Sequence, residues 1–167
     1  MKMTSAQAAK LLRQLKDELS TLNTREYNCK TFVAAQGEDL EMIRPKYDYT
    51  ETKAQIADVE GKIRKLKHIL NVFNCTTLIP EFNVTIDEML VYIPQLTKRC
   101  STLSCMKNAL PIQRERAVGL KGVIEYTYAN YDIELAKNDY ITLSETLAKA
   151  QTALDYVNNT VEMEVDI

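Results

Sequence analysis

Apolar residues recur at alternating steps of three and four along four stretches of this chain. The last stretch is the most regular, and its apolar positions are Ala136, Tyr140, Leu143, Leu147, Ala150, Leu154 and Val157. A repeat of about 3.5 residues keeps one face of a long helix in contact with a second helix along its length. The pattern therefore predicts a scaffold of long helices, which constrains the fold but indicates no chemistry.

Three further stretches share this spacing and predict three more helices. Their apolar positions are Ala8, Leu12, Leu15, Leu19 and Leu22, then Ile56, Val59, Ile63, Leu66, Leu70 and Phe73, then Ile86, Met89, Ile93, Leu96, Cys100 and Leu103. Thr4 or Ser5 suits the first N-cap, and Thr85 with Glu88 reads as a capping box. We expect helices over about 5–22, 51–74, 86–109 and 132–158, all in one helical domain of residues 1–167.

Three short segments break the helical pattern and favour strands. Residues 123–129 are β-branched and aromatic, residues 161–167 alternate apolar with acidic side chains, and residues 31–35 could form a further strand. Two strands alone are marginally stable in water, so this small sheet must pack on the helices or on another subunit. We predict a mainly α fold: long antiparallel helices in a coiled-coil-like bundle, with a small antiparallel sheet at one end.

The length of the apolar seams also predicts self-association. We expect seams this long, with few loops, to leave apolar surface that one chain cannot cover alone. A second copy would bury that surface. The expected assembly is a homo-oligomer.

Composition narrows the classes of partner and compartment. The formal net charge is −2 and the pI is about 5.6, which disfavours extended nucleic acid and anionic lipid as partners. No apolar run approaches the roughly 18 residues needed to span a bilayer, and the first residues lack a signal-peptide core. The four cysteines have no paired metal-binding spacing, and His68 alone cannot complete a zinc site. We expect a cytoplasmic protein with reduced thiols, no metal and no cofactor.

The sequence contains no recognised catalytic motif. A glycine-rich phosphate loop, a GxSxG elbow and an HExxH pair are all missing from it. His68 falls beside the seam of a lysine-rich helix, which favours a boundary position over a catalytic base. Asp87 and Glu88 suit the first turn of a helix, where carboxylates complement the helix dipole. We therefore predict a protein that is not an enzyme and has no catalytic residues.

The connection after the third helix combines basic residues with tyrosines. Such a mixture can hold a phosphate or a flat ring, because guanidinium groups bind oxyanions and phenol rings stack on planar groups. The alternative is a solvated loop followed by a half-buried strand. A similar mixture occurs at Arg44, Lys46, Tyr47 and Tyr49. The candidate ligand-binding residues of the later connection are Arg114, Arg116, Lys121, Tyr126, Tyr128 and Tyr131.

Asparagines gather near the ends of two predicted helices. Asn71 and Asn74, followed by Thr77, lie near the end of the second helix, and Asn158 and Asn159 near the end of the last. Asparagine competes for backbone groups and commonly ends helices, so a cap followed by a turn accounts for both groups. The functional alternative is that the side-chain amides line a pocket and orient a polar ligand.

Parts of the chain from about residue 50 onward resemble a known family. The matching segments are Lys67–Thr77, Thr85–Leu90, Tyr126–Ile133 and Val157–Thr160. They are similar to a family of bacterial and phage-associated proteins labelled septicolysin-like. The resemblance implies a helical fold. Many members carry an Arg-Arg-Asp run in the third helix, where this chain has Tyr92-Ile93-Pro94, so no role carries over to that helix.

These patterns favour a non-catalytic, oligomeric binding protein. Its site would lie between subunits and hold an anionic small molecule such as a signalling nucleotide. The alternative, from another class, is a septicolysin-like membrane-active or purely structural helical assembly. A membrane partner is disfavoured because the seams are narrower than a lipid-facing surface.

Overall fold

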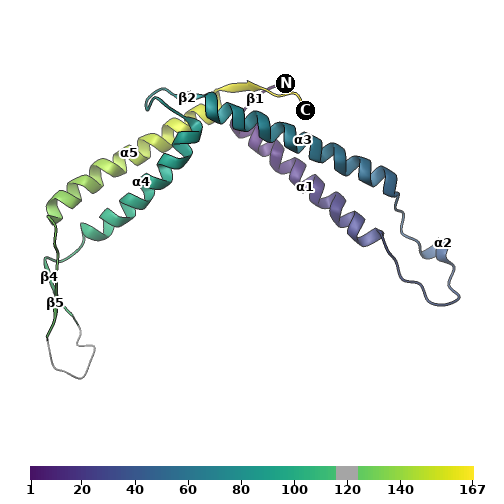
Figure 1. The fold of residues 1–167 in the computed structure, drawn as a ribbon, viewed down its shortest axis with the longest axis horizontal. Helices are drawn as coiled ribbons and strands as arrows, with labels where there is room; N and C mark the ends of the chain where they lie inside the picture. The colour runs from purple at the N-terminus through teal and green to yellow at the C-terminus, as the bar shows by residue number, and fades with distance from the viewer. Residues whose placement is uncertain (116–123) are drawn as a thin grey trace. The chain divides into compact units, whose positions relative to one another are not determined.

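The computed structural model describes residues 1–115 and 124–167, and it is mainly helical (Figure 1). The long helices are α1 (Ser5–Cys29), α3 (Tyr49–Thr76), α4 (Ile86–Met106) and α5 (Ile133–Thr160), and α2 (Leu40–Ile43) is a single turn. The short strands in the described residues are β1 (Lys2–Thr4), β2 (Leu78–Ile79), β3 (Val84–Thr85), β4 (Ile112–Arg114), β5 (Tyr126–Tyr128) and β6 (Glu162–Glu164). The four long helices confirm the helices expected from the seams.

The chain divides into two compact units. Unit 1 comprises Met1–Thr76 and Val157–Ile167, and unit 2 comprises Thr77–Tyr156. The sequence alone predicts one domain over residues 1–167, and whether the two units fold as one remains a prediction.

In unit 1, α1 and α3 run side by side in opposite directions (Figure 1). Their facing side chains form a narrow core that includes Leu15, Val59 and the fully buried Leu66. Strands β1 and β6 pair in antiparallel register, with Met3 opposite Met163, and both methionines are buried. The core of unit 1 is thus a helix pair with a two-stranded ribbon at one end.

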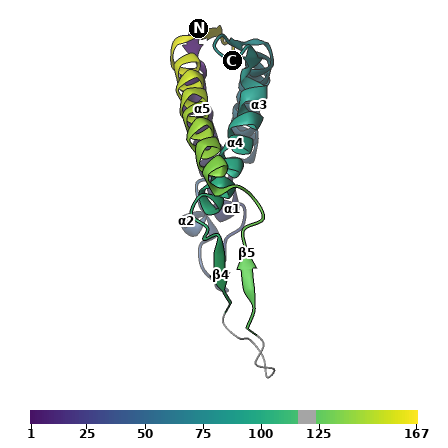
Figure 2. The same ribbon diagram turned by 90° about the vertical axis from the view of Figure 1, so that its left-hand side faces the viewer.

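In unit 2, α4 and α5 also lie side by side (Figures 1 and 2). The ammonium group of Lys107 lies 3.6 Å from the centre of the Tyr140 ring, which joins the end of α4 to α5 by a cation–π contact. The α4 seam buries Met89, Leu96 and Leu103, and the α5 seam buries small residues such as Ala136 and Ala150.

Every predicted seam position is buried or half-buried within one chain. The helix faces away from the seams carry mainly charged and polar side chains. Several seam positions, such as Leu12, Ile63 and Leu147, are only half-buried, so apolar area remains along the seams for a second copy to cover. Homo-oligomer formation stays a prediction.

Within the described part of the chain, the strands form separate two-stranded sheets, β1–β6, β2–β3 and β4–β5, instead of the predicted single sheet. Residues 31–35 form no strand. The predicted strand at 123–129 appears as β5 and pairs with β4 across a local connection. The strand expected at 161–167 appears as β6 and pairs with β1, more than 150 residues earlier. Strand β5 pairs with β4 because the two are close in the sequence. Strand β6 pairs with β1 because the start of α1 and the end of α5 lie together, where Ser5 hydrogen-bonds to Asn158.

Helix α1 ends at Cys29, seven residues beyond the predicted end at Leu22. The seam continues through half-buried Glu26 and Cys29, at steps of four and three. The Glu26 carboxylate accepts a hydrogen bond from the Tyr47 hydroxyl at 3.3 Å. Because Glu26 is acidic, the apolar pattern stops at Leu22, and the pattern therefore does not predict the last turns of the helix.

The order of elements repeats once along the chain. The first repeat, residues 2–79, runs β1, α1, a connection, α3 and β2, and the second, residues 84–164, runs β3, α4, a connection, α5 and β6. Thr4 and Thr85 are both N-caps that form capping boxes, with Gln7 and Glu88 respectively. Identical residues at matching places include Gln14-Leu15 and Gln95-Leu96, Ser20-Thr21-Leu22 and Ser101-Thr102-Leu103, Asn74 and Asn158, and Thr76 and Thr160. The opening strand of each repeat pairs with the closing strand of the other.

Candidate binding site

The connection between α4 and α5 forms a two-stranded ribbon, β4–β5 (Figure 2). Ile112 pairs with Tyr128, Gln113 with Thr127 and Arg114 with Tyr126. Two backbone hydrogen bonds flank the strands in the same register, from Glu115 N to the Glu125 carbonyl at 2.9 Å and from Ala129 N to the Pro111 carbonyl at 3.0 Å. The ribbon positions the side chains of this connection with strand geometry.

The two faces of the ribbon differ in chemistry. Successive side chains of a strand alternate between faces, and directly paired residues share a face. One face therefore carries Ile112, Arg114, Tyr126 and Tyr128, and we call it the Arg–Tyr face. The other face carries Gln113, Glu115, Glu125 and Thr127, and the Thr127 hydroxyl donates a hydrogen bond to Glu115. The acidic side chains of the ribbon are thus separated from the guanidinium group.

The Arg–Tyr face is open to solvent. Tyr126 is 48% exposed and Tyr128 63% exposed, and their ring centres lie 6.5 Å apart. Within the described part of the chain, Arg114 makes no ion pair or side-chain hydrogen bond. An unpaired guanidinium beside two accessible phenol rings can bind an oxyanion and stack on a planar group.

Tyr131, also predicted for this site, has a different position. Its hydroxyl donates a hydrogen bond to the Met106 carbonyl at 2.9 Å, which satisfies one of the last backbone acceptors of α4. It lines a pocket of about 460 Å³ at the base of the ribbon, whose charged lining residues are Asp132 and Glu134. Two carboxylates disfavour an anion there. The predicted residues Arg116 and Lys121 lie outside the described residues.

The structure places the predicted asparagines and Thr77 in different settings. The Asn158 side-chain oxygen accepts a hydrogen bond from the Ser5 hydroxyl at 2.7 Å, so it joins the end of α5 to the start of α1. Asn71 is exposed and Asn74 half-buried on α3, and Asn159 is exposed. The Thr77 carbonyl accepts a hydrogen bond from Ile86 N at 3.0 Å, in unit 2.

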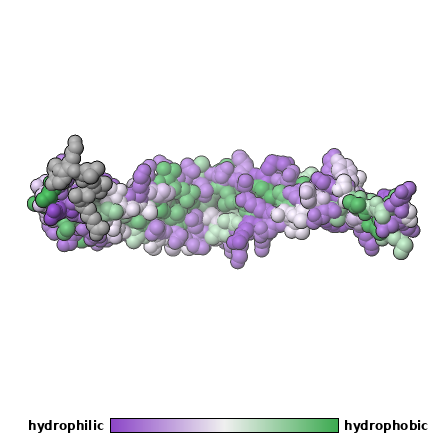
Figure 3. Space-filling model, turned by 90° about the horizontal axis from the view of Figure 1, so that it is seen from below, coloured by the Kyte–Doolittle hydropathy of each residue, from purple (hydrophilic) through white to green (hydrophobic). Residues whose placement is uncertain are grey.

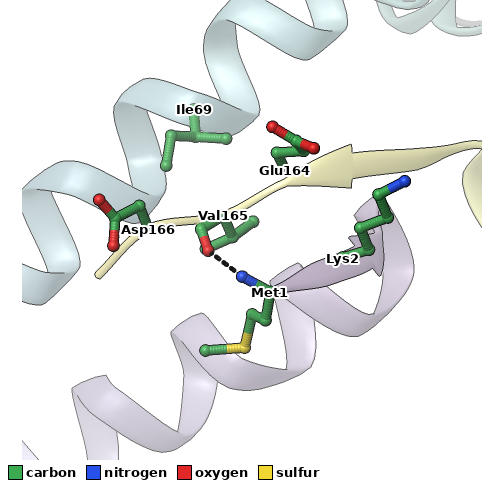
Figure 4. Close-up of a pocket in the computed structure, with 6 residues that line it drawn as sticks. All are labelled: Met1, Lys2, Ile69, Glu164, Val165 and Asp166. Carbon is green, nitrogen blue, oxygen red and sulfur yellow. Dashed lines mark hydrogen bonds between the residues drawn. The ribbon is translucent and has the colours of Figure 1, made fainter.

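A second pocket, of about 400 Å³, lies where β6 passes α3 in unit 1 (Figure 4). Met1 N donates to the Val165 carbonyl at 2.7 Å, and Val165 N donates to the Met1 carbonyl at 2.8 Å. Ile69 faces Val165, while Lys2, Glu164 and Asp166 supply charges of both signs at its border (Figure 4). Sequence reasoning missed this pocket, although the alternation over residues 161–167 predicted the strand that builds it. Mixed charges around a backbone-bonded ribbon suit a structural role.

The connection of unit 1, residues 30–48, is the other region where basic and aromatic side chains meet. Arg44 forms an ion pair with Glu41 at 2.9 Å and lies 5.8 Å from the centre of the Phe32 ring. Desolvation raises the pKa of Tyr47, and the nearby Glu26 carboxylate adds to that shift. The guanidinium group of Arg44 is therefore already paired, in contrast to that of Arg114.

Exposed apolar side chains are frequent in the same connection. Val33 is 96% exposed and Met42 85% exposed, and Leu40 is also exposed. Hydrophobic atoms are visible near the right-hand end of the space-filling view, where this connection lies (Figure 3). A connection of this length is longer than most loops between helices, and such loops are often functional.

The described residues contain no group of His, Cys, Asp and Glu side chains that could hold a metal ion. None of the helices in that same part of the chain is both long and apolar enough to cross a membrane.

Comparisons with known proteins address the fold. No family model matches the sequence, and no curated protein matches it. A solved structure that is similar to this chain is the crystal structure of a functionally unknown conserved protein from Corynebacterium diphtheriae. The two share 16% sequence identity with a TM-score of 0.60, over 98% of this chain and 100% of the other. At this identity, the similarity establishes a common fold only.

Proposed function

We propose that this is a non-catalytic binding protein whose ligand is an anionic small molecule with a flat ring, such as a nucleotide. The Arg–Tyr face of the β4–β5 ribbon is the contact surface. One observation carries the proposal: the guanidinium of Arg114, unpaired within the described residues, lies opposite exposed Tyr126 on a face where those residues place no carboxylate.

The chemistry of the two faces favours an anion on one of them only. Arg114 offers a planar fork of donors that matches a phosphate or carboxylate, and its charge is not neutralised within the described residues. Tyr126 and Tyr128 offer adjacent aromatic surfaces for a ring attached to that anion. Glu115 and Glu125 lie on the reverse face, where they repel an anion and so restrict it to the Arg–Tyr face.

Replacement of Arg114 by glutamine tests the proposal. Arg114→Gln removes the charge and the donor fork from an exposed side chain, so the fold should persist. A charge-assisted hydrogen bond contributes about 1.5–3 kcal/mol, so we expect the Kd for a bound nucleotide to rise by about tenfold or more. Isothermal titration calorimetry with a panel of nucleotides would measure the change.

The matched control is Arg99→Gln, which makes the same change on α4, away from the ribbon. It should leave the Kd unaltered. Tyr126→Phe should retain binding through the ring, whereas Tyr126→Ala should weaken it. If wild-type protein binds no member of the panel, or if both arginine variants weaken binding equally, the proposed function is wrong.

A second candidate function is the membrane-active assembly that the septicolysin-like resemblance suggests. The observation that favours it is the exposure of Val33 and Met42 in the connection of unit 1. Apolar side chains of this kind can enter the boundary of a lipid bilayer. Release of an entrapped dye from zwitterionic vesicles at low protein concentration would support it, and intact vesicles would exclude it.

A further inference from the structure

The outer edge of β5 carries unused backbone hydrogen-bonding groups. In an antiparallel pair, directly opposed residues alternate between those that exchange backbone hydrogen bonds and those that do not. The bonds at Glu115–Glu125 and Pro111–Ala129 fix this alternation, so Gln113 and Thr127 are the bonded pair between them. The N–H and C=O groups of Tyr126 and Tyr128 therefore point away from β4, and they have no partner among the residues the structure describes.

Among the described residues, none of the common protective devices covers this edge. Natural sheets protect exposed edges with proline, lysine, a bulge or a covering loop, because an open edge pairs readily with another chain. The sequence Tyr126-Thr127-Tyr128 contains aromatic and β-branched residues, which favour strands, and all three are exposed. A ribbon of two short strands is marginally stable by itself, and three or more strands give independent stability.

The geometry points to a second copy of this chain as the occupant of the β5 edge. Two β5 strands would pair antiparallel about a twofold axis and create a four-stranded sheet in the order β4, β5, β5, β4. Tyr126 and Tyr128 would exchange backbone hydrogen bonds with Tyr128 and Tyr126 of the second copy. Thr127 would lie opposite its own equivalent on the axis. This register pairs every residue of β5.

The side chains suit that register. Each Tyr126 lies opposite a Tyr128, and cross-strand aromatic pairs stabilise antiparallel sheets. Glu125 lies opposite Ala129, so no two carboxylates are directly opposed. The two Arg114 side chains are on the outer strands and diagonal to each other, which keeps like charges apart. The alternative β4 edge pairs Arg114 with Ile112 and offers no aromatic pair.

This pairing would also complete the proposed ligand site. Four tyrosines would form one continuous surface across the two central strands, with an arginine on each outer strand. The inference uses the ribbon of the proposed function, but the dimer needs no ligand. Failure of nucleotide binding and failure of dimerisation are therefore separate results.

A disulfide tests the register directly. In a background with exposed Cys75 and Cys105 replaced by serine, Thr127→Cys places two thiols at a non-hydrogen-bonded pair on the axis. The Cα atoms of such a pair are about 4.5 Å apart, which permits a disulfide. Mild oxidation of dilute full-length protein should give a covalent dimer of twice 19.1 kDa.

The matched control is Gln113→Cys. Gln113 is paired with Thr127 and shares its face of the ribbon, but it belongs to β4. In the proposed sheet the two Gln113 positions are three strand spacings apart, about 14 Å, which is too far for a disulfide. Gln113→Cys should therefore stay monomeric on the denaturing gel. Equal cross-linking of the two variants, or none of Thr127→Cys, would overturn the inference.

Sedimentation velocity provides a test without cysteines. Tyr126→Pro removes an outward N–H without touching the β4–β5 bonds, and Ile112→Pro makes the same change on the opposite edge. We expect wild type and Ile112→Pro to sediment as dimers and Tyr126→Pro as a monomer, all with the same helical circular dichroism. A monomeric wild type at tens of micromolar, or dissociation by Ile112→Pro alone, would contradict the pairing.

Discussion

The two repeats build similar helix pairs but connect them differently. In the first repeat, α1 and α3 are joined by irregular residues 30–48 with one helical turn, and the basic side chain Arg44 is paired with Glu41. In the second, α4 and α5 are joined through a hydrogen-bonded ribbon whose arginine is unpaired within the described residues. The comparison indicates that the apolar seams determine the helix pairs, whereas the connections between the helices can differ in their chemistry.

The largest expected difference between the repeats concerns their seams. Leu66 and Ala150 occupy matching places on α3 and α5, and both are 0% exposed. Leu66→Ala should lower the free energy of unfolding by about 3 kcal/mol, because it leaves a cavity in the seam of unit 1. Urea denaturation followed by circular dichroism would measure this. A loss below about 1 kcal/mol would show that the α1–α3 seam can close around an alanine at this position.

A smaller difference is expected for the matching asparagines Asn158 and Asn74. Both asparagines are half-buried, but the Asn158 side chain accepts a hydrogen bond from the hydroxyl of Ser5, which is only 7% exposed. Asn158→Ala should lower the free energy of unfolding by about 1 kcal/mol, and Asn74→Ala by less than about 0.5 kcal/mol. Thermal denaturation of both variants provides the measurement. Equal losses would mean that the Ser5 contact is not what distinguishes the two ends.

The smallest expected effect is a pH dependence confined to one capping box. The Thr85 backbone N–H, followed by the Thr85 hydroxyl, donates to the Glu88 carboxylate and holds its pKa below the usual value. This contribution to stability is present above the unfolded-state pKa and is lost as the pH falls through the lowered folded-state pKa. The matching residue of the first repeat, Gln7, does not titrate.

Glu88→Gln should therefore differ from wild type in stability near pH 7 and converge with it in acid. Urea denaturation of both proteins at several pH values would follow the difference. Gln7→Glu is the reciprocal variant, and it should introduce the same pH dependence into the first repeat. A wild-type advantage over Glu88→Gln that does not change with pH would contradict this account.

The sequence was sufficient to predict the helices because their signal is local. Seam positions such as Leu66, Leu96 and Leu154 are buried, and Thr85 caps α4 as its capping box indicates. Strands β1 to β4 were missed because, unlike β5 and β6, they do not lie within a longer aromatic or alternating run. The partner of β1 is also far away in the chain. The repeat is visible in the sequence as two matching Ser-Thr-Leu segments. The apolar period of each helix, taken separately, does not reveal this match between helices.

The candidate site was predicted in part by composition. Arg114, Tyr126 and Tyr128 were selected as a mixture of types, and the β4–β5 register brings them to one face. Tyr131 and Asn158 belong to the same residue types, but their structural partners, Met106 and Ser5, are distant in sequence. Residue type alone cannot distinguish a side chain that awaits a ligand from one that already has an intramolecular partner.

The exchange of closing strands has a consequence for biosynthesis. Because β1 must wait for β6, the ribbon at the head of α1 cannot form until the ribosome has added some 160 further residues. The region from Thr77 to Tyr156 is contiguous, so it can acquire its native contacts first. During translation, the surface around Met3, which is buried in the folded protein, would therefore be among the last to be shielded, and it is where a chaperone would bind.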